Sequence, residues 1–400
     1  MEILIRNGRV IDPRNEINDV RDVGIANGKI VRVDHNIPPQ DAQLVIDATG
    51  MMITPGLVDL HGHYYYGTQP DSDYSNGFKA VPPDGFTLRS GVTTAVDAGG
   101  SGWRNFADFQ KQVIERSQTR VLAMLNIVGS GMKGDPMEQN LEDMDADLTA
   151  RCAKEFPEVI VGIKVAHYRG PDWIPVERAV QAGRLASLPV MVDFGRHVPP
   201  LSLRRLLLEY LRPGDIYTHM YAHIPERLPI VDEKGALEPY VRQARERGII
   251  FDVGHGAGSF VFAQAIPALA QGFAPDSIST DLHAESMNAG LKDMSNLLSK
   301  FLSLGVDLSD VIRMSTWNPA RILHRTDLGH LSPGARADLA VWTLRHGEFG
   351  FVDVEGWKVP GTLKLDCEVT MRDGEVVWDL NGLSKPLGQT GTKDNLKRAP

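Results

Sequence analysis

The middle of the chain repeats one pattern, a short apolar segment followed by a helix-like segment, and this repetition constrains the fold more than any other feature. The expected strands are residues 56–61, 93–98, 120–127, 159–165, 189–194, 215–220, 249–254 and 277–282. Apolar runs without polar alternation are typical of parallel strands buried on both faces, with helices as connections. Eight such units predict an α/β fold, a (β/α)8 barrel of the TIM type. An open doubly wound sheet is the alternative, but no Gly-x-Gly-x-x-Gly turn follows the first strand to favour it.

Both ends of the chain have a different pattern, in which short β-rich runs alternate with turn pairs. Residues 1–54 contain Asn7-Gly8 and Asn27-Gly28, and the region after residue 330 contains Asp373-Gly374. Such pairs between β-rich runs indicate antiparallel hairpins. We therefore expect a small β-sandwich domain built from residues 1–54 plus 330–400, and a barrel domain of residues 55–329.

Composition indicates a globular protein with a large core and argues against several functional classes. A chain of 400 residues with 42% hydrophobic residues can bury a large core. Its net charge of −9 and its dispersed basic residues argue against nucleic-acid binding. Two cysteines, Cys152 and Cys367, exclude a disulfide framework and suit a reducing compartment. The first residues lack a signal-peptide pattern, and no apolar run reaches the ~18 residues of a membrane span.

These features predict a cytoplasmic protein with a small-molecule substrate, without a nucleic-acid partner and without a membrane anchor. They leave the oligomeric state open, a homo-oligomer included.

The first expected strand ends in His61-Gly62-His63. Side chains at positions i and i+2 of a strand share a face, so both imidazoles can reach one metal ion. The pair alone also fits ordinary hydrogen-bonding histidines. The ends of the other strands therefore decide between the two interpretations.

Ionisable or imidazole side chains end six of the eight expected strands. They are His61 with His63, Lys164, Asp193, His219, His255 and Asp281. The carboxyl ends of barrel strands meet on one face, where the active site of such folds lies. Gathering uncompensated charges there would be costly. A metal centre would supply the missing positive charge.

The motifs that contain these residues resemble those of the amidohydrolase superfamily. The resemblance extends over essentially the whole chain, and Val-Gly-His-Gly at 253–256 and Ser-Thr-Asp-Leu-His at 279–283 are similar to its deacetylase-type members, relatives of dihydroorotase, hydantoinase and D-aminoacylase. The matching segments are residues 7–12, 53–63, 91–94, 162–164, 218–219, 252–256, 279–283, 316–320 and 329–338.

The resemblance implies two divalent metal ions, usually zinc, bridged by a hydroxide and a carboxylated lysine. His61, His63 and Asp281 would hold the first metal, Lys164 would bridge to the second, and His219 would bind the second. Carboxylation by CO2 turns the lysine from a cation into an anionic oxygen ligand. The cofactors that the resemblance implies are two divalent metal ions and a CO2-derived carboxylate on Lys164.

Asp193 departs from this family pattern, because the strand-five ligand is usually a histidine. A carboxylate can bind a divalent metal but adds negative charge. The second site would then prefer manganese, bind zinc more weakly, or stay empty. Two alternatives remain open: Asp193 pairs with Arg196, or His197 substitutes for the missing imidazole.

The resemblance and the predicted site imply hydrolysis of an amide or ester carbonyl. A metal lowers the pKa of bound water and polarises the carbonyl, and Asp281 would act as general base and then general acid. The leading hypothesis is deacylation of an N-acyl amino acid or O-acyl hydroxy acid. The alternatives are a cyclic amidase similar to dihydroorotase or hydantoinase, and a non-catalytic assembly module, against which the retained ligands argue.

Four further residues are candidates for substrate binding. Arg169 could pair with a substrate carboxylate, although a solvated loop arginine is an equally good interpretation, and Tyr168 lies beside it. His255 and His283 are expected to donate hydrogen bonds at the pocket mouth. The long segment 64–84 is expected to form a lid or pocket wall.

Overall fold

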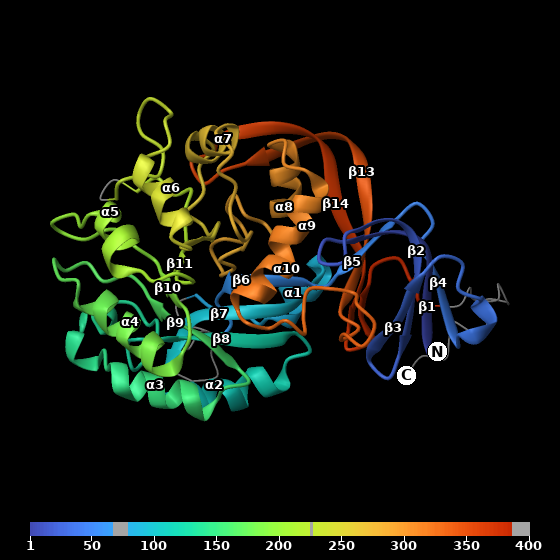
Figure 1. The fold of residues 1–400 in the computed structure, drawn as a ribbon, viewed down its shortest axis with the longest axis horizontal. Coiled ribbons are helices and arrows are strands. Elements are labelled where there is room, and N and C mark those ends of the chain that lie inside the picture. The colour runs from blue at the N-terminus through green and yellow to red at the C-terminus, as the bar shows by residue number, and fades with distance from the viewer. Residues whose placement is uncertain (67–78, 225–226, 386–400) are drawn as a thin grey trace, which may run out of the picture.

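The computed structural model describes residues 1–66, 79–224 and 227–385 and contains a curled parallel sheet in the middle of the chain. Its seven strands follow one another in chain order across the sheet (Figure 1). They are β6 (Leu57–Gly62), β7 (Val92–Gly102), β8 (Arg120–Asn126), β9 (Ile160–Val165), β10 (Val190–Val192), β11 (Ile216–Tyr217) and β12 (Ile250–Phe251).

The eighth expected strand, residues 277–282, closes the sheet through single bridges rather than as a regular strand. Parallel bridges join Ser277 to Asp252 on one side and Leu282 to Gly62 on the other. The backbone turns left-handed at Asp281, with φ 49°, which interrupts the extended conformation. The predicted barrel is confirmed, and its eighth strand is irregular.

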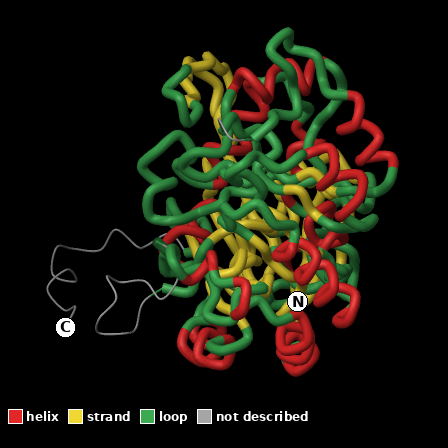
Figure 2. Tube along the Cα trace, turned by 90° about the vertical axis from the view of Figure 1, so that its left-hand side faces the viewer, coloured by secondary structure: helices red, strands yellow, loops and turns green. Residues whose placement is uncertain are grey.

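Helices and loops surround this sheet, as Figure 2 shows by the strands in its interior. Side-chain caps start several of the helices; for example, Asp145 accepts from the N–H groups of Asp147 and Leu148, and Asp293 accepts from the N–H group of Asn296. The α-helices are α1 (Asp84–Thr87), α2 (Phe106–Gln112), α3 (Ala146–Glu155), α4 (Ile174–Ala186), α5 (Leu203–Arg205), α6 (Pro239–Glu246), α7 (Phe262–Ala270), α8 (Met294–Ser303), α9 (Leu308–Ser315) and α10 (Trp317–Ile322).

A second sheet combines strands from both ends of the chain, seen as the blue and red strands on the right of Figure 1. Its order is β15-β14-β13-β5-β1-β2-β3, and β4 also pairs with β1. The two ends meet where β5 and β13 run antiparallel, with Pro55 opposite Leu339. The strands are β1 (Ile3–Asp12), β2 (Ile17–Ala26), β3 (Lys29–Asp34), β4 (Leu44–Asp47), β5 (Met52–Pro55), β13 (Leu339–Val352), β14 (Lys358–Arg372) and β15 (Glu375–Asp379).

Two of the three turn pairs form hairpins in this sheet. Asn27-Gly28 joins β2 to β3 and Asp373-Gly374 joins β14 to β15, each with positive φ at both residues. That backbone matches the twist of paired strands. The expectation of a turn at Asn7-Gly8 is wrong: the pair forms a bulge inside β1, where the Asn7 N–H donates to Asp22 Oδ1 at 2.8 Å.

Buried polar and aromatic contacts fasten the second sheet to the barrel. Arg120, at the start of β8, pairs with Asp338 and with Asp373, the latter at 3.0 Å. The fully buried Trp342 of β13 donates its indole N–H to Thr54 at 2.9 Å and lies over Gly91 at the entry to β7. These side chains therefore help to fix the second sheet on the barrel.

Gly91 gives a stability test of this contact. It has φ +77°, and a Cβ added there would lie 2.3 Å from Trp342 Cζ2, whereas Gly50, with φ +78°, has nothing within 4 Å. Both Ala substitutions carry the left-handed strain of about 1–2 kcal/mol. Gly91→Ala should add overpacking of about 1–3 kcal/mol, measured by urea unfolding against Gly50→Ala. Equal destabilisation by the two variants would show that the Trp342 contact is not tight.

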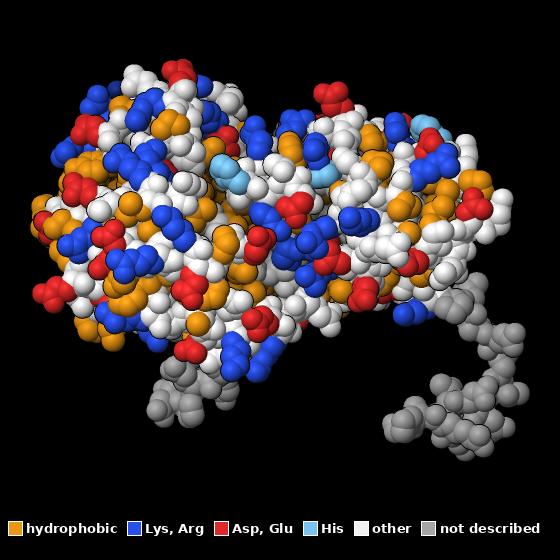
Figure 3. Space-filling view, turned by 60° about the horizontal axis from the view of Figure 1, so that its bottom comes forward, with side chains coloured by type: hydrophobic (Ala, Val, Ile, Leu, Met, Phe, Trp, Pro, Cys, Tyr) orange, Lys and Arg blue, Asp and Glu red, His pale blue; other side chains and the backbone are white. Residues whose placement is uncertain are grey.

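The surface has no single-sign patch on the face that Figure 3 draws, where basic and acidic side chains are interspersed. In the described ranges, none of the helices has the length and apolar character needed to cross a membrane.

Candidate active site

Residues from the carboxyl ends of three barrel strands form a buried cluster of metal-ligand type. Ligand atoms of His61, His219 and Asp281 all lie within 4.8 Å of one another. His63 joins them, with its Nε2 at 2.9 Å from Asp281 Oδ1, while His61 Nε2 lies 3.6 Å from the same oxygen. The residues that the sequence predicts for the first metal are therefore brought together.

Hydrogen bonds behind two of the imidazoles fix which ring nitrogen faces the cluster. Thr218 Oγ1 donates to Asp252 at 2.7 Å, so it can only accept from His61 Nδ1, 3.0 Å away. His219 Nδ1 lies 2.6 Å from the Gly254 carbonyl, which is also only an acceptor. Both rings thus carry the proton on Nδ1 and present the Nε2 lone pair to the centre.

Electrostatics favour the neutral form of His61. Burial and the neighbouring Lys164 amine lower the pKa of His61 to about 3. A neutral imidazole with a free lone pair is the form that binds a metal.

Lys164, from β9, reaches the same point with its amine. The side chain is 1% exposed, and Nζ lies 3.2 Å from His61 Nε2 and 3.4 Å from Met191 Sδ. Burial lowers the pKa of this amine although Asp193 and Asp281 oppose the effect. Among the described residues no carboxylate forms an ion pair with this amine, which is unusual for a buried amine and suits a group that reacts or is modified.

Asp281 is held against Gly256. A Cβ at Gly256, which has φ +54°, would lie 2.2 Å from Asp281 Oδ2, so this position requires glycine. Burial alone would raise the pKa of Asp281, but His61, His283 and His63 outweigh it and hold the pKa well below its usual range. The Asp281 carboxyl is therefore ionised.

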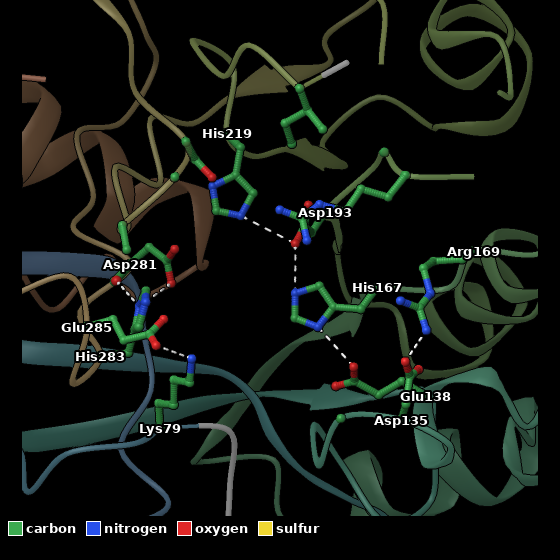
Figure 4. Close-up of a pocket in the computed structure, with 17 residues that line it drawn as sticks. Lys79, Asp135, Glu138, His167, Arg169, Asp193, His219, Asp281, His283 and Glu285 are labelled. Atoms are coloured by element: carbon green, nitrogen blue, oxygen red, sulfur yellow. Dashed lines mark hydrogen bonds and ion pairs between the residues drawn. The ribbon is translucent and has the colours of Figure 1, made fainter. Parts of the chain in front are cut away.

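Asp193 contacts two imidazoles at the end of β10. Its Oδ2 lies 3.5 Å from His219 Nε2 and 3.2 Å from His167 Nε2, and His167 Nδ1 lies 3.0 Å from Glu138 Oε2 (Figure 4). Burial would raise the pKa of Asp193, but the contacts with the His219 and His167 imidazoles outweigh it and keep that pKa well below its usual range. These contacts thus form a continuous series from Glu138 through His167 and Asp193 to His219.

Neither alternative for Asp193 that the sequence leaves open appears in this geometry. In the described part of the chain no ion pair joins Asp193 to Arg196. His197 is buried beside Phe194, with ring centroids 4.6 Å apart, and faces Tyr168. Sequence reasoning assigned no role here to Glu138 or His167; the only signal was the place of His167, three residues after Lys164.

The four predicted substrate-binding residues lie in different places. Arg169 and His283 line the pocket over the metal-ligand cluster, where Arg169 pairs with Asp135 and His283 Nδ1 lies 2.8 Å from the Asp281 carbonyl. Tyr168 lies outside that lining and donates to Asp172 at 3.0 Å. His255 is fully buried outside it.

His255 forms a buried pair with Lys300 of α8. The Lys300 amine donates to His255 Nε2 at 2.6 Å and to the Gly290 carbonyl at 3.0 Å, and the imidazole stacks on Phe260. Burial lowers the pKa of Lys300 to about 7. The neighbours of His255 in the chain, Gly254 and Gly256, contact His219 and Asp281. The His255–Lys300 pair therefore helps to hold these two cluster residues in place.

The pocket over the cluster has a volume of about 550 Å³. Its rim carries two ion pairs, Lys79 with Glu285 and Arg169 with Asp135, which Figure 4 shows on either side of His167. Of the expected lid, residues 64–66 and 79–84 are described and Lys79 lines this pocket, while residues 67–78 lie outside the described residues.

Comparisons with known proteins agree with this arrangement. The model of the Amidohydrolase family matches residues 260–377. A deacetylase of Agrobacterium fabrum is 36% identical over 338 residues, which cover 82% of this chain and 80% of the relative. A deacetylase of Brucella anthropi is 35% identical over 325 residues, covering 80% and 77%.

Two solved structures are similar over nearly all of the chain. A crystal structure of an adenine deaminase has a TM-score of 0.83 at 26% identity, covering 94% of this chain and 99% of that one. A crystal structure of a dihydroorotase has a TM-score of 0.80 at 30% identity, with the same coverage.

Proposed function

The chain belongs to the amidohydrolase superfamily and is a hydrolase of C–N bonds, and on that premise we propose that it removes the acyl group from an N-acyl amino acid or an O-acyl hydroxy acid. The observation that carries the proposal is the buried convergence of His61, His63, Lys164, His219 and Asp281 at one end of the barrel. The names of the deacetylase relatives support an acyl substrate.

The donor set fits two divalent metal ions. His61, His63, Lys164 and Asp281 would hold the first, and Lys164, His219 and Asp193 would hold the second. The test is the chemistry of the donors: two imidazoles present Nε2 lone pairs, and two carboxylates are ionised. Zinc suits the imidazole-rich first site, while the carboxylate-bearing second site would favour manganese or bind zinc more weakly.

Lys164 would join the two sites after carboxylation. A neutral amine attacks CO2, forms an N–C bond and loses one proton to solvent, which leaves an anionic carbamate. The burial that lowers the pKa of this amine favours the neutral, nucleophilic form. Divalent metals bound here would lower the pKa of a water molecule and polarise the scissile carbonyl.

Asp281 would carry the proton. As an ionised carboxylate at the centre of the cluster, it can accept a proton from the attacking water and return it to the leaving nitrogen or oxygen. His283, whose ring lies against the Asp281 backbone, would bind substrate at the pocket mouth, whereas Arg169 lines the same pocket but is paired with Asp135. Tyr168 and His255 lie outside the pocket lining and would support these residues without contacting the substrate.

A cyclic amidase is the second candidate, and the similarity to a dihydroorotase structure favours it. A non-catalytic module is less well supported, because five side chains of metal-ligand type are retained: His61, His63, Lys164, His219 and Asp281. A screen of N-acyl amino acids and O-acyl hydroxy acids in both enantiomers, with dihydroorotate and hydantoins alongside, separates these functions. We expect turnover of acyclic acyl substrates; turnover of the cyclic amides alone would favour the second candidate, and none at all in metal-loaded protein would contradict the proposal.

Asp193→Ala should release the second metal and leave the first. The Asp193 carboxylate lies 3.5 Å from His219 Nε2, so both can bind the second metal. The first-metal residues His61, His63 and Asp281 contact one another without it. Asp193→His should keep both metals, because imidazole is an ordinary zinc ligand. Anomalous diffraction counts the metals in each variant.

Asp135→Ala provides the control for Asp193→Ala, since it removes a half-exposed carboxylate from the same pocket and should keep both metals. Two fully occupied sites in Asp193→Ala would show that the carboxylate is no ligand.

A further inference from the structure

The pocket rim carries three long cationic side chains, and only two of them have a carboxylate partner within the described residues. Lys79 pairs with Glu285 and Arg169 pairs with Asp135. Arg196 lines the same pocket and is exposed, yet it forms no ion pair in the parts of the chain that the structure describes. Its guanidinium is thus available for a ligand.

The loop that carries Arg196 is held firmly on both sides of it. Phe194 and His197 are buried, and the Phe194 ring stacks on Trp173 with centroids 5.7 Å apart. Beneath the loop, the buried Arg227 donates to the Phe194 carbonyl at 2.7 Å and to the His219 carbonyl. Arg196 therefore projects from a rigid support that is connected directly to a residue of the metal cluster.

The backbone at Arg196 has φ +62°, a left-handed conformation that residues with a Cβ rarely adopt. Four other residues of this pocket share the conformation, and two of them, His219 and Asp281, belong to the metal-ligand cluster; the other two are Lys79 and His167. Such backbone conformations persist where the surrounding structure enforces them, and they concentrate at functional sites.

Three carboxylates of the pocket are paired with basic side chains, so Arg196, which is unpaired among the described residues, can bind an anionic substrate. The carboxylates of Asp135, Glu138 and Glu285 would repel an anionic substrate, but each has a basic partner: Arg169, His167 and Lys79. Arg196 lines the same pocket as Asp193, His219 and Asp281. A guanidinium can bind a carboxylate through two parallel hydrogen bonds.

We propose that Arg196 binds the free carboxylate of an acyl amino acid or acyl hydroxy acid and so determines the preference of the enzyme for anionic substrates. This inference rests on the proposed acyl hydrolysis. Arg169 is the competing residue, but its guanidinium is already engaged by Asp135.

The test compares each N-acetyl amino acid that the metal-loaded protein hydrolyses with its carboxamide. The quantity measured is the ratio of kcat/KM for the acid to kcat/KM for the amide. Arg196→Met should lower this ratio roughly 10- to 100-fold, the usual range for a charge-assisted contact. Arg196→Lys should lower it less, because an ammonium retains the charge without the bidentate geometry.

Two further variants complete the design. Arg313→Met removes a half-exposed arginine of α9 outside the pocket lining and should leave the ratio unchanged. Arg169→Met distinguishes the two pocket arginines, and thermal unfolding of every variant shows whether it is folded. Should Arg196→Met destabilise the protein, Arg196→Gln gives the same comparison with a polar side chain.

An unchanged ratio in folded Arg196→Met or Arg196→Gln, or a fall in the ratio confined to Arg169→Met, would overturn the assignment while acyl hydrolysis stands. Failure of the wild-type protein to hydrolyse both acids and amides would instead contradict the proposed function, and the role of Arg196 with it.

Discussion

Lys164→Ala is expected to abolish turnover and to lower the metal content. The amine is fully enclosed at the centre of the site, 3.2 Å from His61 Nε2, and belongs to both proposed metal sites. Without it, two metal ions would lose a shared anionic ligand and repel one another at short range. Metal analysis and kcat on the same preparation measure both effects.

Short carboxylic acids should restore part of the activity of Lys164→Ala, because they can occupy the space and charge of the lost carbamate. Lys154→Ala, which removes an exposed lysine from α3, is the matched control and should behave as wild type. Full activity of Lys164→Ala without an added acid would remove the carboxylated lysine from the mechanism.

Asp281→Asn should reduce kcat by about 10²–10⁴-fold, the usual contribution of a general acid–base group. The amide is close in size to the carboxylate beside Gly256, so the fold should persist, but it can neither accept nor return the proton. Single-turnover kinetics separate this loss from slow product release, and thermal unfolding checks the fold.

Asp310→Asn makes the same chemical change at an exposed position of α9 and should leave kcat unchanged. A rate for Asp281→Asn within a factor of about three of wild type would lie far outside the range expected for a proton-transfer group.

Most of the fold follows from local sequence pattern. The strands β6 to β9 can be predicted because their residues are apolar and therefore buried. The turns at Asn27-Gly28 and Asp373-Gly374 can be predicted because these residue types adopt positive φ readily. The bulge at Asn7-Gly8 could not be predicted, because it depends on Asp22 accepting from the neighbouring strand. The broken eighth strand likewise depends on the left-handed backbone at Asp281.

The candidate site divides in the same way. His61, His63, Lys164, His219 and Asp281 end strands, and a barrel brings strand ends together regardless of the loops. Glu138 and His167 come from two different loops, and only tertiary structure shows that they contact one another and reach Asp193.

The sequence could not predict either that the Arg196 guanidinium has no carboxylate partner among the described residues. Sequence pattern places Arg169 and Arg196 in equivalent positions after strands, and only the partner of Arg169, Asp135, distinguishes them.

Metal content and hydrolysis, measured on the same sample, test metal-dependent acyl hydrolysis most directly. Chelation should remove the metals and the activity together, and stepwise return of zinc or manganese should restore turnover of an acylated substrate. The restored rate should saturate once the His61, His63, Lys164 and Asp281 site and the Asp193 and His219 site are filled. Full turnover by protein from which chelation has removed essentially all metal would contradict it.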